Sequence, residues 1–340
     1  MKTSIEEYEE TKRSLKRTLG LKRILGSSQA VIQLRQRIDN IASCDVSVLI
    51  SGESGVGKEL AARAIHYLSS RASKPFIPVN CGAIPENLFE NELFGHRKGA
   101  YTDASLHQDG LVKEAEGGTL FLDEIGVISP YIQVKLLRLL QEKEYKPLGD
   151  SKTRKADVRI IAATNKNLKT MVKEGTFRED LFFRLNIVSL SIPSLRGRKE
   201  DIPLLVGYFI KKYSREYRKP IKGLSKEAMA ALLSYSWPGN IRELENKIQH
   251  AIVMAERERI TVSDLDIVTA EIQGSAEIHK LERFKEAKQR AVEAFEKDYL
   301  TFLMAACRGD VVNAALQAGK SRTALWNLLA KYHLHPRQFV

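Results

Sequence analysis

A glycine-rich turn between an apolar segment and an amphipathic one constrains this chain more than any other feature of its sequence. The turn reads Gly52-Glu53-Ser54-Gly55-Val56-Gly57-Lys58. It follows residues 46–51, a predicted buried strand, and precedes residues 59–68, a predicted helix. Glycines in this position let backbone N–H groups surround an anion, and the helix N-terminus adds a favourable dipole. The pattern predicts a P-loop in which Lys58 reaches the β- and γ-phosphates of a nucleoside triphosphate.

The residue after this lysine departs from the usual P-loop. Glu59 stands where Ser or Thr would offer a hydroxyl ligand to Mg²⁺, so direct metal contact by the loop is left open. The alternative reading, a glycine-rich turn without function, is disfavoured because strand, loop and helix are all in place.

Polar residues follow two further predicted strands. The strand 119–122 runs into Asp123 and Glu124, and carboxylates at such a strand end lie in the ligand crevice of an open α/β sheet. Asp123 is expected to hold Mg²⁺ directly or through water, and Glu124 to orient and deprotonate the attacking water. The strand 158–163 is followed closely by Asn165, a candidate contact to the γ-phosphate or to that water. Taken alone, Asn165 is better explained as part of a strand-ending turn.

The surrounding residues predict an α/β fold class with a parallel sheet. Strands are expected at 46–51, 76–79, 119–122, 158–163 and 187–191. Several are apolar without alternation, which is typical of parallel strands covered on both faces, and helical segments separate them. From about 198 to 258 the pattern is helical only, which predicts a small helical domain appended to the sheet.

Composition narrows the range of partners and compartments. The 340-residue chain has a formal net charge of +12, which favours nucleic acid and then anionic membranes as partners. Its three cysteines, Cys44, Cys81 and Cys307, match no metal-ligand spacing and indicate thiols in a reducing compartment. We find no membrane-spanning run and no signal-peptide core, and therefore expect a cytoplasmic protein without a membrane partner.

The C-terminal residues predict two short helices joined by a tight turn. Asp310 is expected to cap a helix at 311–318, Gly319 to allow the turn, and Ser321 to cap the next helix. Apolar residues at i, i+3, i+4 and i+7 of the second helix would face the core; these are Leu325, Leu328, Leu329 and Tyr332.

This pattern fits a helix-turn-helix, although a generic helical hairpin has the same signature. Arg322 and Asn327 are candidates to read base edges, and Lys331 is a candidate phosphate contact. The full set of candidate DNA-binding residues is Ser321, Arg322, Thr323, Trp326, Asn327 and Lys331.

Residues from roughly 24 to 255 resemble the AAA+ domain of sigma-54-dependent transcription activators, the bacterial enhancer-binding proteins. The resemblance rests on the P-loop with its glutamate and on Gly117-Gly118-Thr119-Leu120-Phe121-Leu122-Asp123-Glu124. It rests also on Glu92-Leu93-Phe94-Gly95-His96 followed by Gly99-Ala100-Tyr101-Thr102-Asp103-Ala104, and on Trp237-Pro238-Gly239-Asn240-Ile241-Arg242-Glu243-Leu244. The C-terminal segment resembles the Fis-like DNA-binding domain that ends many such proteins.

The resemblance implies an ATPase that uses Mg²⁺, with the P-loop, Glu59, Asp123 and Arg242 at the nucleotide. Asn80 looks like the residue that restrains the catalytic Glu124. Arg178 and Arg184 are similar to arginine fingers, which implies that subunits form a ring, a hexamer by resemblance. Pairing of the Fis-like domains implies dimers and an inverted-repeat site on double-stranded DNA.

The segment Gly99-Ala100-Tyr101-Thr102-Asp103-Ala104 is similar to the family's polymerase-contacting loop, which usually reads Gly-Ala-Phe-Thr-Gly-Ala. Tyr101 keeps the aromatic ring, and Thr102 is retained. Asp103 adds a negative charge and lacks the freedom of glycine. We expect the loop still to engage sigma-54 with altered strength.

These inferences predict five segments. They are an N-terminal helical segment or linker (1–23), an AAA+ α/β subdomain (24–192), an AAA+ helical lid (193–258), a linker (259–290) and a Fis-like domain (291–340). No receiver, GAF or PAS domain is evident, so control by a partner protein in trans and removal of a regulatory domain both stay open.

The predicted function is ATP-dependent activation of transcription, in which the DNA-bound protein remodels sigma-54 RNA polymerase holoenzyme. Two alternatives are a DNA-binding regulator that has lost remodelling through Tyr101 and Asp103, and an AAA+ remodeller of another protein.

Overall fold

The computed structural model describes residues 24–100, 106–267, 284–332 and 334–339. The predicted segment 1–23 and the loop residues Tyr101, Thr102, Asp103 and Ala104 lie outside the described residues. The chain forms two compact units, Met1–Thr269 and Ala270–Val340, and each is described by itself.

A five-stranded parallel sheet with the order β2-β5-β8-β1-β9 forms the centre of the first unit. Its strands are β1 (Val48–Ser51), β2 (Phe76–Asn80), β5 (Thr119–Asp123), β8 (Arg159–Thr164) and β9 (Val188–Ser191). The α/β class and all five predicted strands are confirmed, with small shifts at the strand ends. β8 is buried along its whole length, which explains its run of apolar residues without alternation.

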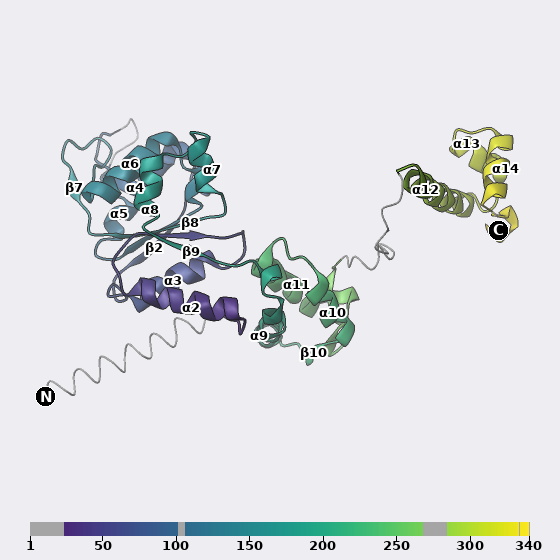
Figure 1. Cartoon of the computed structure of the whole chain (residues 1–340), viewed down its shortest axis with the longest axis horizontal. Coiled ribbons are helices and arrows are strands. Elements are labelled where there is room, and N and C mark those ends of the chain that lie inside the picture. Colours follow the sequence, from purple (N-terminus) through teal and green to yellow (C-terminus); the bar gives the residue numbers. More distant parts are fainter. Residues whose placement is uncertain (1–23, 101–105, 268–283, 333, 340) are drawn as a thin grey trace. The chain divides into compact units, whose positions relative to one another are not determined.

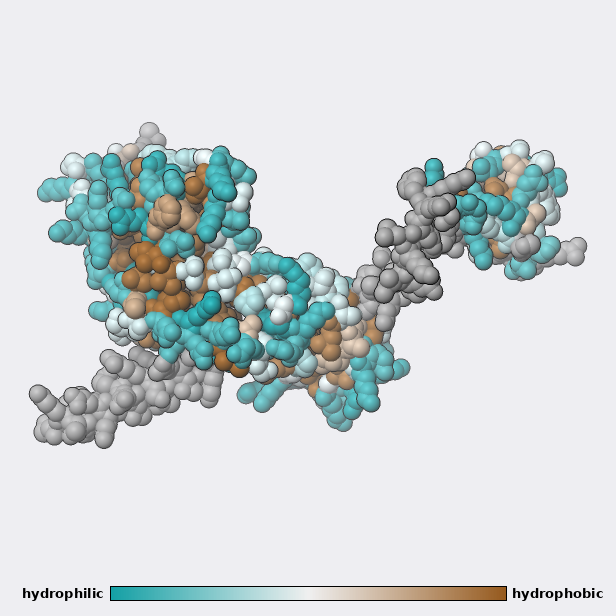
Figure 2. Space-filling model, in the orientation of Figure 1, coloured by the Kyte–Doolittle hydropathy of each residue, from teal (hydrophilic) through white to brown (hydrophobic). Residues whose placement is uncertain are grey.

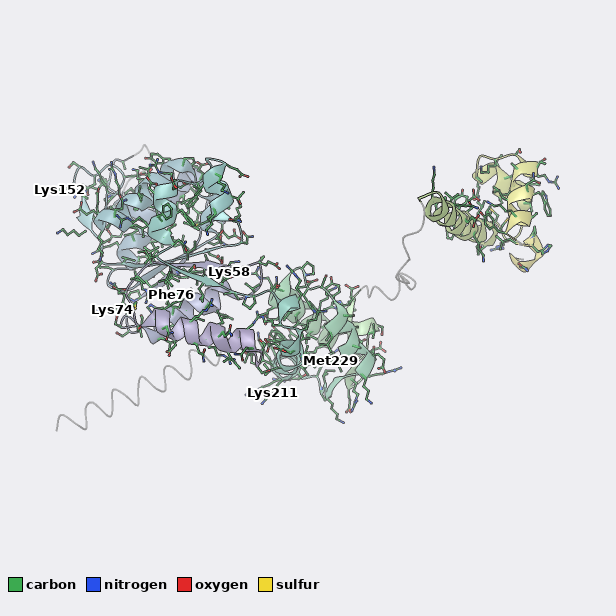
Figure 3. All side chains as sticks on the ribbon, viewed as in Figure 1. Lys58, Lys74, Phe76, Lys152, Lys211 and Met229 are labelled. Carbon is green, nitrogen blue, oxygen red and sulfur yellow. The ribbon has the colours of Figure 1, made fainter. Side chains whose placement is uncertain are left out.

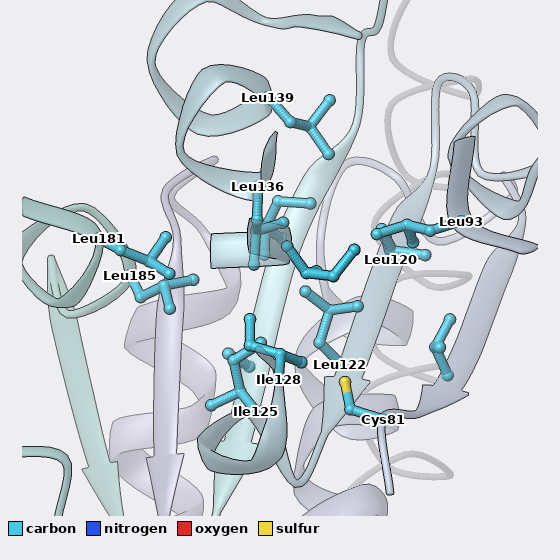
Figure 4. Packing of buried hydrophobic residues seen from close by; sticks show 14 of the residues in the cluster. Cys81, Leu93, Leu120, Leu122, Ile125, Ile128, Leu136, Leu139, Leu181 and Leu185 are labelled. Carbon is cyan, nitrogen blue, oxygen red and sulfur yellow. The ribbon is translucent and has the colours of Figure 1, made fainter. Parts of the chain in front are cut away.

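Helices cover both faces of this sheet (Figure 1). On one face lie α2 (Gln29–Ala42) and α3 (Lys58–Leu68). The other face carries α4 (Glu86–Phe94), α5 (Leu111–Glu114), α6 (Pro130–Glu142), α7 (Leu168–Lys173) and α8 (Glu179–Leu185). Figure 4 shows the hydrophobic core on the face covered by α4–α8, in which Leu120 and Leu122 of β5 lie among leucines of α6 and α8. Removing apolar area on both faces of the sheet from water stabilises this layered arrangement.

A helical lid follows the sheet, as predicted. It contains α9 (Ile202–Glu216), α10 (Lys226–Ser234) and α11 (Asn240–Met254). Trp237 is fully buried at its centre and donates its indole N–H to the Leu232 carbonyl at 2.8 Å.

The lid also extends beyond residue 258, where a linker was predicted to begin. The short strand β10 (Gly223–Leu224) pairs with β11 (Arg259–Ile260), and the 3-10 turn η4 (Ser263–Leu265) follows. Ile260, Leu265 and Ile267 are buried in the lid core. Their burial, rather than the charged residues between them, decides that the segment folds with the lid.

The second unit contains α12 (Phe284–Ala306), α13 (Val311–Gln317) and α14 (Arg322–Lys331), followed by the turn η5 (Pro336–Phe339). The Asp310 and Ser321 side chains cap α13 and α14 as predicted, and Gly319 has a φ of 60° in the turn. Leu325 and Leu329 are buried in the core of this unit, with Leu328 and Tyr332 packed against them. α12 begins before residue 291, where the module was expected to start.

The face of the first unit seen in Figure 2 is mostly hydrophilic over the outer sides of its helices, with hydrophobic residues visible at the level of the sheet. Among the described residues, we find no helix with the length and apolar character that crossing a bilayer requires.

Candidate nucleotide site and interaction surfaces

Polar residues at the ends of four neighbouring strands meet at one edge of the sheet. Asn80 ends β2 and pairs in register with Asp123 at the end of β5. β8 ends beside β1, with Thr164 paired to Ser51, so Asn165 and the P-loop leave the sheet together. In open parallel sheets this carboxyl edge is where ligands bind. Figure 3 shows Lys58 at this edge, on the side of the sheet next to the lid.

The P-loop leaves the N-terminus of α3 open. Gly57 precedes the helix with a φ of 99° and offers no side chain as a cap. The first N–H groups of α3 therefore lack the partners that a capping side chain would supply, and an anion satisfies such groups well. Lys58 curls back over the loop and donates from Nζ to the carbonyls of Gly52 and Glu53 at 2.9 and 3.0 Å.

Burial lowers the pKa of Lys58, and the positive charge of Arg242 acts in the same direction. The negative charges of Asp123 and Glu124 oppose both effects. Lys58 therefore lies within electrostatic reach of the acidic pair from β5 and of the arginine from the lid. The tertiary structure brings together three groups that the sequence places far apart.

The N-terminus of α11 docks directly on the P-loop. The N–H groups of Ile241 and Arg242 donate to the Gly55 carbonyl at 3.0 and 3.3 Å. A Cβ at residue 55 would lie only 2.2 Å from the Gly239 carbonyl oxygen, so only glycine fits there. The Arg242 guanidinium lies 3.4 Å from the Ser54 hydroxyl, which places it at the rim of the loop.

Glu53 ties the same loop to the lid through its side chain. Its carboxylate pairs with Arg196 and accepts a hydrogen bond from the Asn240 amide at 3.1 Å. The hydrogen bond from Arg196 is the main cause that lowers the pKa of Glu53. Glu53 was predicted as part of the phosphate loop, and the structure gives its side chain a role in fastening the lid.

The acidic pair has an unusual backbone. Glu124 has a φ of 57° and a ψ of 39°, a left-handed conformation that few residues other than glycine adopt, and its N–H donates to Asp123 Oδ1 at 2.9 Å. A Cβ at Gly82 would lie 2.4 Å from the Glu124 carboxylate and 3.4 Å from the Asn80 amide oxygen. Glu124 and Asn80 are therefore neighbours at Gly82, where their predicted interaction requires them to be.

The residues at this edge can hold Mg²⁺ only if a bound phosphate supplies further oxygen ligands. Among the described residues, no three His, Cys, Asp or Glu side chains converge on a point that would hold a metal. Mg²⁺ in nucleotide sites is usually bound through one or two carboxylates together with phosphate oxygens and water, and Asp123 suits that arrangement. Glu59 instead pairs with Arg63 at 2.7 Å on the surface of α3.

Cys81, next to Asn80, is chemically quiet. Burial raises the pKa of its thiol to about 12, and the charge of Asp123 acts in the same direction. A thiol with such a pKa is not a nucleophile near neutral pH. The reading of the cysteines as ordinary thiols suits this residue.

A pocket beside the P-loop shares Val56 and Gly57 with the loop, but most of its other lining residues belong to no motif, and sequence reasoning missed it. It has a volume of about 620 Å³ and is mostly apolar, with Ile24, Leu25, Val56, Ile192 and Phe209 among its lining residues. Pockets of this size accept small organic ligands. The guanidinium of Arg198 also lines it; burial lowers the pKa of this arginine, and its buried Nε has no hydrogen-bond partner in the described structure.

Of the two predicted arginine fingers, Arg178 is the N-cap of α8 and Arg184 lies in its last turn. The Arg178 guanidinium pairs with Asp180 at 2.8 Å, and Arg184 is exposed without a hydrogen bond or ion pair to any described residue. Within the described chain, neither arginine contacts Lys58 or the acidic pair. Arginines that act on the nucleotide of a neighbouring subunit require such a placement.

The stem of the predicted polymerase-contacting loop is well defined. β3 (Gly95–His96) pairs antiparallel with β4 (Gln108–Asp109), and Gly99 and Ala100 lead towards the loop tip. A second hairpin, β6 (Glu144–Tyr145) with β7 (Arg154–Lys155), supports this stem. Asp150, in the turn of that hairpin, is buried and accepts hydrogen bonds from Arg97 at 2.8 Å and Arg154 at 3.3 Å.

The second unit exposes the predicted outer face of α14. Arg322, Thr323, Trp326 and Asn327 are all exposed. Lys331 is engaged within the unit, because it pairs with Glu296 of α12 at 3.0 Å. Lys331 must therefore leave Glu296 before it can bind a phosphate group.

The fold and the strand-end residues define an AAA+ P-loop ATPase with a helical lid. A family model described as "Sigma-54 interaction domain" matches residues 24–191, and one described as "AAA+ ATPase lid domain" matches residues 196–280. The chain belongs to the family of sigma-54-dependent transcriptional regulators.

Known proteins similar to this chain are transcriptional regulators. The regulatory protein AtoC of Escherichia coli K12 is 46% identical over 92% of this chain and 68% of its own length. The transcriptional regulatory protein GlrR of the same organism is 44% identical over 93% of this chain and 69% of its own. The crystal structure of NtrX from Brucella abortus in complex with ADP aligns with a TM-score of 0.70 at 37% identity, covering 97% of this chain and 73% of NtrX.

Two alanine substitutions test the packing of the lid on the P-loop. Gly55 and Gly175 have φ values of 76° and 72°, so each substitution has a similar left-handed cost of about 1–2 kcal/mol. Only at Gly55 does the new Cβ meet a carbonyl oxygen; at Gly175 nothing lies within 4 Å. In urea titrations, Gly55→Ala should lower the free energy of unfolding by about 1–3 kcal/mol more than Gly175→Ala. Equal losses would contradict the close approach of loop and lid.

Proposed function

We propose that this protein is an ATP-driven transcription activator that binds DNA and remodels sigma-54 RNA polymerase so that promoter DNA opens. The observation that carries the proposal is the meeting of Lys58, the Asp123-Glu124 pair and Arg242 at one edge of the sheet. The NtrX structures in complex with ADP and with ATP support a nucleotide at this edge. A bacterial cytoplasmic location follows from these partners.

The residues at the edge divide the chemistry of hydrolysis among them. Lys58 exchanges its carbonyl partners for phosphate oxygens, and the open N-terminus of α3 receives the β-phosphate. Asp123 would hold Mg²⁺, which would supply positive charge that stabilises the charge on the phosphates. Glu124 takes the proton of the attacking water, and Asn165 orients that water or the γ-phosphate.

The path from this edge to the polymerase-contacting loop is short. Asn80 ends β2, and α4 begins six residues later at Glu86 and ends at Phe94, directly before the stem strand β3. Because a helix is stiff, a shift of the chain at Asn80 is passed along α4 to the stem. Release of Asn80 from Glu124 after hydrolysis would therefore move the segment that contains Tyr101 and Thr102.

A ring completes the site. Arg178 and Arg184 stabilise the charge on the departing γ-phosphoryl group of a neighbouring subunit, and we propose a hexamer as the assembly. A regulatory partner acting in trans would then act on assembly or on nucleotide exchange.

The second unit binds DNA as a dimer. The outer face of α14 presents Arg322 and Asn327 to base edges, with Ser321, Thr323, Trp326 and Lys331 around them. Pairing is supported by an apolar stripe on α12, where side chains three and four residues apart are exposed. The stripe consists of Val292 (44% exposed), Phe295 (68%), Tyr299 (41%) and Phe302 (76%). Heptad spacing of this kind is typical of helices that pack against a second copy, which gives an inverted-repeat DNA site.

An open-complex assay with sigma-54 holoenzyme, a linear promoter fragment and ATP tests the proposed function. The wild-type protein should open the promoter, whereas Glu124→Gln should bind ATP normally and lose about 100-fold or more in hydrolysis. Asp103→Gly measures the effect of the altered loop. ATP hydrolysis without promoter opening, in both the wild type and Asp103→Gly, would favour a remodeller of another protein.

If only Asp103→Gly opens the promoter, the natural chain is a DNA-binding regulator that has lost remodelling. Near-normal turnover by Glu124→Gln would contradict the assigned role of this glutamate.

Mixing two inactive variants tests the contribution of a neighbouring subunit. Glu124→Gln retains its arginines, and Arg184→Ala retains its glutamate. Each variant alone should hydrolyse ATP slowly. The rate of Arg184→Ala should fall about 1,000-fold relative to the wild-type protein. In mixed rings some interfaces pair an intact Glu124 with an intact Arg184, so steady-state turnover should recover in part. Turnover equal to the sum of the separate variants would contradict arginine fingers in trans.

A charge placed on the α12 stripe tests pairing of the second unit. Phe295→Glu in the full chain should abolish cooperative binding to an inverted-repeat fragment, because like charges would face each other across the helix pair. The control Lys297→Glu alters charge beside the stripe at an exposed position and should keep pairing. Gel shifts and sedimentation of the two full-chain variants measure this pairing; unchanged pairing of Phe295→Glu would place the contact elsewhere.

A further inference from the structure

The wall of the pocket beside the P-loop is a segment of chain that precedes the first described helix. Ile24 and Leu25 line the pocket, and Gly26, Ser27 and Ser28 connect them to α2. Ser28 is the N-cap of α2, and its carbonyl accepts from the Ile32 N–H at 3.0 Å. Residues 24–27 form neither helix nor strand, so backbone hydrogen bonds of regular structure do not hold them. Their position must come from side chains of other elements.

Two charged side chains from different elements hold this segment. Arg35 of α2 donates to the carbonyl of Ile24 at 2.6 Å and to that of Gly26 at 2.8 Å. Asp201, at the start of the lid, accepts from the N–H groups of Ser27 and Ser28 at 2.6 and 2.8 Å. Its second oxygen accepts from the Ser28 hydroxyl at 2.6 Å. The guanidinium of Arg35 thus donates to carbonyls of the segment, and the carboxylate of Asp201 accepts from its N–H groups.

The segment packs closely against the Asp201 carboxylate. The carboxylate is fully buried, and burying a charge is costly unless hydrogen bonds compensate it. A Cβ at Gly26 would lie 2.9 Å from Asp201 Oδ2 and 2.9 Å from a methyl group of Val31, and Gly26 has a φ of 150°. Only glycine therefore allows the segment to lie this close to the carboxylate.

Asp201 also links the segment to the lid and to the P-loop. It directly precedes α9, which contributes Leu205, Tyr208 and Phe209 to the same pocket. Arg198, three residues earlier, interacts electrostatically with Asp201 and reaches the Val56 carbonyl of the P-loop at 3.5 Å. One buried carboxylate thus joins the wall of the pocket, the lid and the phosphate loop.

We propose that Asp201 and Arg35 are positioning residues for ATP, which clamp residues 24–28 as the wall against which the base and ribose bind. This inference rests on the proposed function, because it takes ATP as the ligand. Neither residue touches the phosphates or the attacking water. Their loss therefore weakens the binding of the nucleoside part and leaves the chemistry at Glu124 intact.

The test compares three variants of the full chain that weaken the clamp to different degrees. Asp201→Asn removes the charge, Arg35→Gln removes the donors to Ile24 and Gly26, and Ser28→Ala removes one hydroxyl. Asp264→Asn is the control, because Asp264 likewise accepts from a backbone N–H and a hydroxyl, both of Thr261 at 2.7 Å, but lies outside the pocket.

Two ligands separate the nucleoside from the phosphates. Fluorescent ATP reports binding to the whole site, and Mg²⁺-tripolyphosphate, measured by calorimetry, reports binding to the P-loop alone. Asp201→Asn and Arg35→Gln should raise the Kd and the KM for ATP about tenfold, which corresponds to about 1.4 kcal/mol, with kcat within a factor of about two. Ser28→Ala should have a smaller effect, and the control should have none. Tripolyphosphate affinity should stay unchanged in all of them.

Unchanged ATP affinity in folded Arg35→Gln and Ser28→Ala would overturn the proposal even if Asp201→Asn fails to fold. Parallel loss of ATP and tripolyphosphate affinity would also overturn it, because that result indicates general disruption of the site. Failure of the wild-type protein to bind ATP would instead contradict the proposed function, so the two failures are distinguishable.

Discussion

The contact between the N-terminus of α11 and the Gly55 carbonyl is the interaction on which the site depends. It joins the lid to a loop that itself ends a central strand, so the nucleotide edge and the helical lid form one structure. Glu53, Arg196 and Asn240 strengthen this contact with side-chain hydrogen bonds. Because the contact uses backbone atoms at a glycine, no side chain can replace it.

Around this contact, each functional group is held by a different element. Lys58 comes from the start of α3, Asp123 and Glu124 from the end of β5, and Asn80 from the end of β2. A parallel sheet brings strand ends to one edge, which explains why residues distant in sequence meet there. The Glu124 carboxylate and the Asn80 amide oxygen both lie close to Gly82, which has no side chain to fill the space. From the end of β2 the chain continues through α4 to the loop stem at β3, so the edge of the sheet and the stem are joined by one helix.

The loop stem of the first unit and the helices of the second unit are likewise supported by neighbouring elements. The stem of the loop is stabilised by a second hairpin whose buried Asp150 accepts hydrogen bonds from two arginines. In the second unit, the apolar residues of α14 face the core and its polar face is exposed. Aromatic residues of α12 are also exposed within the described structure. Exposed apolar stripes of this kind indicate a surface made for another molecule.

Much of this protein was determined by sequence alone. Apolar runs of strand length, the glycine spacing of the P-loop, the acids after β5 and the caps Asp310 and Ser321 depend on local chemistry, so their patterns predicted the elements correctly. Tertiary structure decided the rest. It folded Ile260, Leu265 and Ile267 into the lid, turned Glu53 towards the lid, and paired Lys331 with Glu296. It also built the pocket wall at residues 24–28, which has no motif because Asp201 and Arg35 hold it by contacts to backbone atoms, and backbone atoms leave no signature in a sequence.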